Sequence, residues 1–274
     1  MEIVTTSAKL VQLRGEFSGS VGLVPTMGAL HAGHVALFEA SKRDNDYTIA
    51  SIFVNPAQFL EGEDFERYPR KHEADINVAQ KAGIDLLFMP SVSEIYPHDD
   101  EVLLNAPKKG GYVLEGAFRA GHFSGVLRVV MKLLNLARPA RAYFGQKDAQ
   151  QLLLVRQMVR DLFLPYEIVG IPTVRDPDGL ALSSRNLYLT PEQRKEALKI
   201  SAALNEAMKR IMTGERSSDK IKASVRAILE GLSVDYFEVV DYHLRPCSEV
   251  KKGESLILVA ARVGNVRLID NLWI

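Results

Sequence analysis

The chain has 274 residues, with 34 lysines and arginines against 34 aspartates and glutamates, so its formal net charge at pH 7 is zero. With 47% hydrophobic residues, it can form one or two globular domains without a metal or a disulfide. The balanced charge argues against a nucleic-acid partner, and the short apolar runs argue against a membrane span.

Cysteine usage and the amino-terminal sequence both predict a cytoplasmic protein. Cys247 is the single cysteine, which excludes an intramolecular disulfide and a cysteine-based zinc site. The residues after Met1 lack the charged segment and apolar stretch of a secretory signal.

The first part of the chain alternates short β-rich runs with segments of helical periodicity, which is typical of βαβ units. Strands are expected at residues 21–24, 47–54, 85–89, 141–144 and 166–171. Helices are expected at residues 35–43, 73–81, 125–137 and 149–161. The pattern therefore predicts an α/β fold with a parallel sheet flanked by helices.

After about residue 173 the pattern changes. Pro172, Pro177 and Gly179 interrupt the chain, and a helix to about residue 212 is expected to begin at a Thr190 cap. A second helix is expected at residues 218–231, followed by strands at 235–241, 255–263 and 266–273. We therefore expect an α/β domain over residues 1–174 and a smaller α+β cap domain over residues 175–274.

Residues 61–66 form an acidic run, Glu-Gly-Glu-Asp-Phe-Glu. Such a run is more typical of a solvated loop than of a metal site. We predict a solvated loop without a catalytic role, although Phe65 indicates that part of it packs.

The first strand is followed by glycines and histidines where a helix is expected to begin. In an open parallel sheet, ligands bind beyond the carboxyl ends of the strands. Gly28 and Gly33 allow close backbone approach, and His31 and His34 add hydrogen-bond donors, so the turn suits phosphate. The histidines could equally well be local caps, and zinc would need a third ligand.

Three further polar clusters are expected at the same edge or facing it. Asn55 and Gln58 follow the second strand and could bind hydroxyls and carboxylates, or simply form a turn before a helix. Lys147 and Asp148 follow the 141–144 strand, as a phosphate contact or as a surface pair. Residues 182–186 lie in the loop between the expected domains, where hydroxyls and a guanidinium could reach polyphosphate, or where the loop has no such role.

These clusters together resemble a known family. His31-Ala32-Gly33-His34 is similar to the HxGH motif of nucleotidylyl transferases and class I synthetases, and residues 182–185 lie where their KMSKS-type loop would be. More narrowly, the chain resembles the pantothenate synthetases (pantoate–β-alanine ligases) over nearly its whole length. The blocks that carry this resemblance, in order, are residues 25–34, 53–59, 68–70, 121–123, 144–148 with Gln151, and 183–186.

The resemblance implies ATP-dependent condensation of pantoate with β-alanine through a pantoyl-adenylate, releasing AMP and pyrophosphate. It also implies that residues 1–174 form a Rossmann-like domain and that residues 175–274 form a lid. It further implies Mg²⁺ with the nucleotide, a homodimer and a cytoplasmic location. The implied catalytic residues are His31, His34, Lys147, Ser183, Ser184 and Arg185.

The implied binding residues follow from the same motifs. Those for ATP are Pro25, Thr26, Met27, Gly28, Ala29, Leu30, His31, Ala32, Gly33, His34, Gly145, Gln146, Lys147, Asp148, Val174, Leu182, Ser183, Ser184 and Arg185. Those for pantoate are Asn55, Gln58 and Gln151, and Gln58 is also near β-alanine. The family commonly has Glu at position 146 and Met at position 182, where this chain has Gln and Leu.

The magnesium ligands stay open, with Asp75, Asp148 and Asp176 as candidates. A nucleotidyltransferase that stops at a phosphate ester would share the HxGH chemistry, but it gives no account of the amides at positions 55, 58 and 151. An aminoacyl-tRNA synthetase would need more basic surface, and a regulatory module that has lost catalysis would not need the retained histidines and cations.

Overall fold

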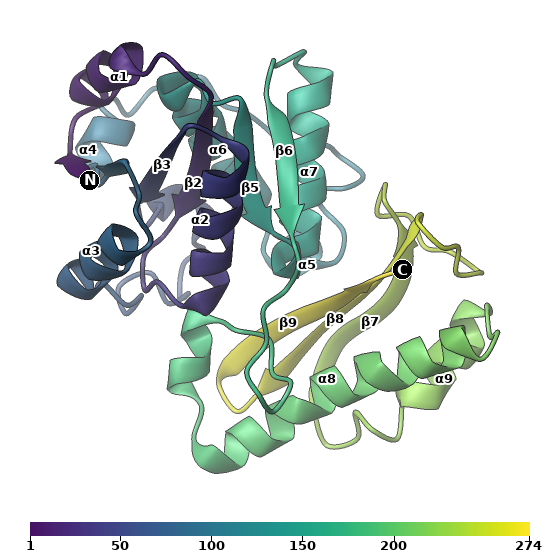
Figure 1. The fold of residues 1–274 in the computed structure, drawn as a ribbon. Coiled ribbons are helices and arrows are strands. Elements are labelled where there is room, and N and C mark those ends of the chain that lie inside the picture. Colours follow the sequence, from purple (N-terminus) through teal and green to yellow (C-terminus); the bar gives the residue numbers. More distant parts are fainter.

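The computed structural model describes residues 1–274 and contains two sheets with helices around them (Figure 1). The first sheet is parallel, in the order β1-β4-β3-β2-β5-β6. Its strands are β1 (Glu2–Val4), β2 (Val21–Thr26), β3 (Tyr47–Ile52), β4 (Leu86–Phe88), β5 (Arg141–Gly145) and β6 (Glu167–Ile171). The predicted fold class, a Rossmann-like α/β sheet, is confirmed.

Helices cover both faces of this sheet because its strands bury alternate residues on opposite sides. Leu23 of β2 packs in a core with α1 (Ser7–Glu16), α6 (His122–Ala137) and α7 (Ala149–Asp161). Its neighbour Val24 packs in a second core with α2 (Ala32–Asp44) and α3 (His72–Lys81). Two short helices, α4 (Val92–Ile95) and α5 (Glu115–Phe118), lie in the long connections.

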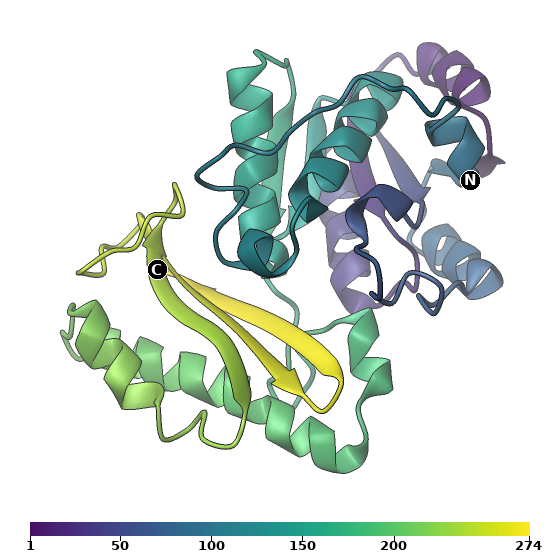
Figure 2. The ribbon, with the colours of Figure 1, turned by 180° about the vertical axis from the view of Figure 1, so that it is seen from behind.

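The second sheet is antiparallel, with strands β7 (Ser233–Asp241), β8 (Ser255–Val263) and β9 (Val266–Trp273) in that order. In β8, Ile257 and Val259 face α8 (Pro191–Met212) and α9 (Ser218–Val225), while Leu256 and Leu258 join the core of the first sheet. The small sheet therefore lies between α8 with α9 and the larger unit, as both views show (Figure 2). The predicted boundary at residues 174 and 175 falls in the connection between β6 and α8 and stays a prediction.

Several details differ from the sequence prediction. β1 and α1 were not predicted, because β1 has three residues and α1 buries only Leu10 and Leu13. The second helix of the carboxy-terminal part ends at Val225 rather than near residue 231, since most of the bonds that follow, such as Ile228 N to Val225 O, are of the tighter three-residue type. No helix of the structure is long and apolar enough to cross a membrane.

Candidate active site

The strand order creates a switch point between β2 and β5, the place where an open parallel sheet binds ligands. From β2 the chain proceeds outward through β3 to β4, and β5 and β6 extend the other side of the sheet. The turn at residues 27–31 follows β2, and the 3-10 helix η2 (Gln146–Asp148) follows β5. Two of the predicted polar clusters thus meet at this edge.

The turn after β2 is held by a buried carboxylate. Asp75 of α3 accepts from the backbone N–H groups of Ala29 at 2.9 Å and Leu30 at 2.7 Å. Gly28 has a φ of +84°, and a Cβ there would lie 2.9 Å from an Asp75 oxygen, so the turn requires glycine. Because Asp75 occupies these two amides and is itself only 2% exposed, neither the amides nor the carboxylate is open to a ligand.

His31 and His34 cap the start of α2 reciprocally. Nδ1 of His31 accepts from Gly33 N, and Nδ1 of His34 accepts from His31 N at 3.2 Å. Each histidine is therefore a local cap through its Nδ1, while its Nε2–H remains available as a hydrogen-bond donor. Burial lowers the pKa of His34 to about 3, and burial with Lys147 nearby lowers the pKa of His31. Both rings are therefore neutral at pH 7 and can donate a hydrogen bond through Nε2–H. A neutral His34 is poorly suited to act as a general acid.

A chain of amides orients Gln58, which ends the 3-10 helix η1 (Pro56–Gln58). Asn55 Nδ2 donates to Gln58 Oε1 at 3.0 Å, and Asn55 Oδ1 accepts from Tyr96 OH at 2.7 Å. Gln58 Nε2 therefore points the other way, donating to Met27 Sδ at 3.1 Å. Asn55 is fully used inside the protein and acts on a ligand through Gln58.

A cavity of about 890 Å³ lies between the two sheets and within the size range of small-molecule sites. Of the residues predicted from sequence, it is lined by Lys147, Asp148, Gln151, Ser183 and Arg185. The HxGH turn, Asn55, Gln58, Gly145, Gln146, Val174, Leu182 and Ser184 lie outside its lining. Ser183 caps the 3-10 helix η3 (Ser184–Tyr188), which carries Arg185 to the cavity.

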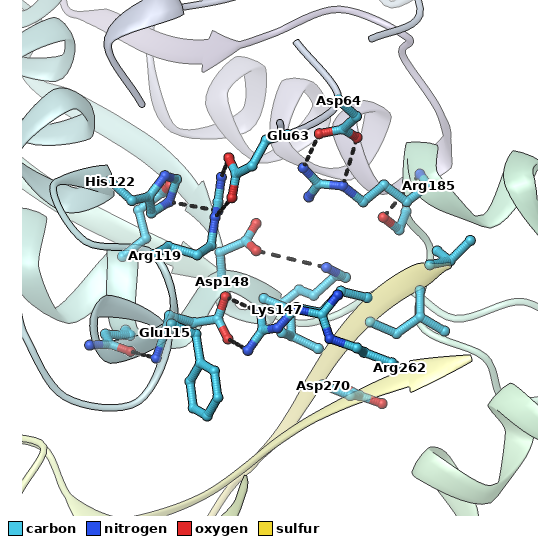
Figure 3. Close-up of a pocket in the computed structure, with 18 of the residues that line it drawn as sticks. Glu63, Asp64, Glu115, Arg119, His122, Lys147, Asp148, Arg185, Arg262 and Asp270 are labelled. Carbon is cyan, nitrogen blue, oxygen red and sulfur yellow. Dashed lines mark hydrogen bonds and ion pairs between the residues drawn. The ribbon is translucent and has the colours of Figure 1, made fainter. Parts of the chain in front are cut away.

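The acidic run at residues 61–66 is only in part the solvated loop that we predicted, because two of its carboxylates form ion pairs (Figure 3). Glu63 forms a two-pronged ion pair with Arg119, at 2.6 and 2.7 Å, and Asp64 forms one with Arg185, at 3.0 and 2.9 Å. Residues 61–64 line the cavity, and the carboxylates of Glu63 and Asp64 meet guanidiniums, whereas Glu61 and Glu66 are exposed. The packing expected for Phe65 is present, against Phe59 with ring centroids 5.3 Å apart.

Arg119 and His122 are site residues that the motif analysis did not assign. His122 Nδ1 donates to the carbonyl of Gln58 at 2.7 Å, so its Nε2 accepts from Arg119 Nη1 at 3.1 Å. Arg119 thereby lies beside Gln58 at the cavity wall. No sequence signal for Arg119 was available, because a single arginine before a helix has no distinctive pattern.

The neutral state of His122 predicts a pH-dependent stability. Burial lowers its pKa to about 4, with Arg119 as the second cause. A histidine that stays neutral in the fold binds its proton more readily when unfolded, so this contribution is complete above about pH 6.5 and is lost as the pH falls. We expect the difference in free energy of unfolding between the native chain and His122→Gln to narrow by about 2 kcal/mol from pH 7.5 to pH 5.

Urea unfolding at the two pH values measures this difference. The control is His98→Gln, at an exposed histidine. The difference in free energy of unfolding between the native chain and this variant should be the same at both pH values. A difference that is equally large at both pH values for His122→Gln would show that His122 is protonated freely in the fold.

A second polar cluster joins the two sheets across the cavity. Glu115 of α5 accepts from Tyr236 OH and from Arg267 Nη1, each at 2.7 Å. Arg267 Nε donates to Asp235 at 2.6 Å, and its guanidinium lies over the ring of Phe118. The carboxy-terminal sheet is thus fixed to the first unit by ionic contacts as well as by the shared core.

Comparison with known proteins agrees with this architecture. The model of the family "Pantoate-beta-alanine ligase" matches residues 2–273. Pantothenate synthetases of Wolinella succinogenes and Helicobacter pylori are 63% and 48% identical, each covering the whole of both chains. A crystal structure of pantothenate synthetase from Thermus thermophilus has a TM-score of 0.94 at 46% identity, covering 99% of each chain.

A second similar solved structure is a complex with ligands. It is pantoate-β-alanine ligase from Francisella tularensis complexed with β-γ ATP and β-alanine, with a TM-score of 0.82 at 35% identity, covering 100% of this chain and 97% of that one. With a family model over nearly all residues and full-length relatives far above 30% identity, the chain belongs to the pantoate–β-alanine ligase family, the pantothenate synthetases.

Proposed function

We propose that the chain condenses pantoate with β-alanine to pantothenate, using ATP and releasing AMP and pyrophosphate. The observation that carries the proposal is the full-length family match on a fold whose switch point presents the HxGH turn beside Lys147. A carboxylate is a poor electrophile toward an amine because its oxygen leaves poorly. Adenylation solves this problem, because the carboxylate oxygen is then bonded to phosphorus and departs as part of AMP, which is a good leaving group.

In the first step, the pantoate carboxylate attacks the α-phosphorus and pyrophosphate departs. This step requires donors that stabilise charge on the phosphates. The Nε2–H groups of His31 and His34 and the ammonium of Lys147 supply them from one side, and Ser183 and Arg185 from η3.

In the second step, the neutral amine of β-alanine attacks the acyl carbon of the adenylate. The bond from this carbon to the phosphate oxygen breaks, AMP leaves with that oxygen, and the proton lost by the nitrogen passes to solvent. Gln58 has a donor held in place by Asn55, which suits a pantoate hydroxyl or carboxylate, and Gln151 lines the cavity nearby. The carboxylate of β-alanine needs a cation, and Arg119 is the guanidinium beside Gln58, where this carboxylate has to displace or share Glu63. A cavity closed to water protects the mixed anhydride, which is the purpose of the proposed lid.

We propose that Mg²⁺ enters with ATP and neutralises phosphate charge. The chain has no group of three or more acidic, histidine or cysteine side chains that could hold a metal by itself. Of the three predicted aspartates, Asp75 has both oxygens engaged and Asp176 pairs with Arg194 at 2.6 Å. Asp148 lines the cavity with its side chain half exposed, which fits a metal that keeps phosphate and water ligands.

A homodimer in the cytoplasm is proposed from family membership alone. Light scattering on the purified chain measures the mass, and a value of 30.5 kDa would contradict the dimer.

The Asp64 pair leads to a prediction about ATP affinity. Asp64 occupies the two Arg185 nitrogens that a phosphate would use, so ATP has to displace or share this carboxylate. We expect Asp64→Asn to bind ATP about 3- to 10-fold more tightly, measured by calorimetry. Glu61→Gln removes the same charge from the same run and the same cavity wall, but Glu61 is exposed and has no arginine partner. This control should change the affinity less than twofold.

Weaker ATP binding by Asp64→Asn would mean that Asp64 holds Arg185 for the nucleotide. An equal gain in both variants would mean that only the overall charge matters.

The activity itself is tested by ATP–pyrophosphate exchange with pantoate present and β-alanine absent. Exchange that depends on pantoate, followed by AMP and pantothenate when β-alanine is added, would support the proposal. No exchange from folded, ATP-binding protein would overturn pantoate as the substrate, and exchange with a phosphate ester would favour a nucleotidyltransferase.

A further inference from the structure

The last strand of the carboxy-terminal sheet contacts the short helix that carries Lys147. Asn271 of β9 donates through Nδ2 to two successive carbonyls of η2, Gln146 O at 2.9 Å and Lys147 O at 2.6 Å. Trp273 Nε1 also donates to Gln146 O, at 3.3 Å. These donors come from a part of the sequence more than 120 residues away.

The two carbonyls are special because they lie on either side of the Lys147 Cα. The carbonyl of Gln146 belongs to the peptide plane before this Cα, and the carbonyl of Lys147 belongs to the plane after it. Since a peptide unit is rigid, holding both carbonyls restrains φ and ψ of Lys147 and therefore the direction of the Cα–Cβ bond from which its side chain extends. A single hydrogen bond would leave one of these planes free to rotate.

The Asn271 amide is itself firmly oriented. The residue is 4% exposed, and both Nδ2 hydrogens have carbonyl partners. Its Oδ1 is buried and has no partner, which costs free energy. The side chain thus leaves its acceptor unpaired while both of its donor hydrogens reach η2. Next to it, Asp270 accepts from Asn271 N at 2.8 Å and forms a two-pronged pair with Arg175, which anchors the strand.

The side chain of Lys147, in contrast, makes few contacts that would fix its position. Its ammonium lies 3.7 Å from Asp148, and this is the single ion pair that it makes. Its placement in the cavity therefore depends on the backbone of η2 (Figure 3). Catalytic groups have to be held within a fraction of an ångström, because a misplacement of about 1 Å can cost on the order of 100-fold in rate.

We propose that Asn271, assisted by Trp273, is a positioning residue for Lys147 in the adenylation step. The proposal rests on the role of Lys147 in the proposed function. It makes the carboxy-terminal sheet a structural part of the ATP site in addition to a cover over it.

The test is a double-mutant cycle on pantoate-dependent ATP–pyrophosphate exchange in the full chain. We expect Asn271→Ala to slow exchange about 10- to 100-fold, and Asn271→Asp, which has the same shape but places oxygen against two carbonyls, to slow it further. In a Lys147→Ala background, adding Asn271→Ala should change the rate less than twofold. A merely structural residue would not lose its effect when Lys147 is absent.

Val259→Ala is the matched control for destabilising the same sheet. Val259 is fully buried against the α8 side and has no bond to η2, so exchange should stay within about twofold of the native rate. The inference is overturned if Asn271→Ala slows exchange equally with and without Lys147, or if Val259→Ala slows it as much. Native exchange by Lys147→Ala would overturn the role of Lys147, whereas loss of exchange in the native chain would overturn the proposed function.

Discussion

Lys147→Ala is expected to slow pantoate-dependent ATP–pyrophosphate exchange about 100- to 1000-fold while the chain stays folded. Lys147 is the cation at the switch point nearest the HxGH turn, close enough to lower the pKa of His31. Removing one preorganised donor from a site where charge develops typically costs about 3 to 4 kcal/mol. The measurement is the rate of ATP–pyrophosphate exchange at saturating ATP and pantoate.

Lys251→Ala provides the control, because Lys251 is an exposed lysine outside the cavity. Its exchange rate should equal that of the native chain. Exchange by Lys147→Ala within about threefold of native would remove Lys147 from the catalytic assignment and leave the phosphates to the histidines and Arg185.

Gly125→Ala is the second change expected to have a large effect, although position 125 does not face the cavity. A Cβ at this position of α6 would lie 2.0 Å from the backbone oxygen of Ala57, in η1. Real contacts of this kind are far longer, so η1 has to move, and with it Gln58. We expect kcat/KM for pantoate to fall about 100-fold, because a shift of about 1 Å in a positioned group has that order of effect.

The loss should be specific to pantoate, so the Kd for ATP should change little in Gly125→Ala. Gly15→Ala is the matched control, since Gly15 is also in a helix and has open space around it. That control should retain activity and gain up to about 1 kcal/mol in stability. Equal losses for ATP and pantoate in Gly125→Ala would indicate a general loss of the fold.

The parallel sheet could be predicted because short runs of β-forming residues indicate its strands, and apolar residues at helical spacing indicate its helices. The switch point then brings residues 27–34 and 146–148 to one edge, so Lys147 near His31 follows from topology. That the turn requires a glycine at position 28 could also be expected, since a turn into a helix commonly needs a positive φ. These features depend on short stretches of chain.

Arg119, Glu63 and Asn271 could not be predicted in the same way. Each acts through a partner far away in the sequence: Glu63 with Arg119 across 56 residues, and Asn271 with Lys147 across 124. The acidic run has the composition of a solvated loop, and only the placement of two arginines opposite it changes that interpretation. Local pattern carries no information about such pairs.

The shared core around β8 has a consequence for how the protein is made. Leu256 and Leu258 complete the core of a sheet whose own strands end at Ile171, and residues 271 and 273 brace the backbone after β5. During translation, the parallel sheet emerges long before the residues that finish it. The nascent chain therefore carries an incomplete core, and η2 lacks its hydrogen bonds from Asn271 and Trp273, until the last strand is synthesised.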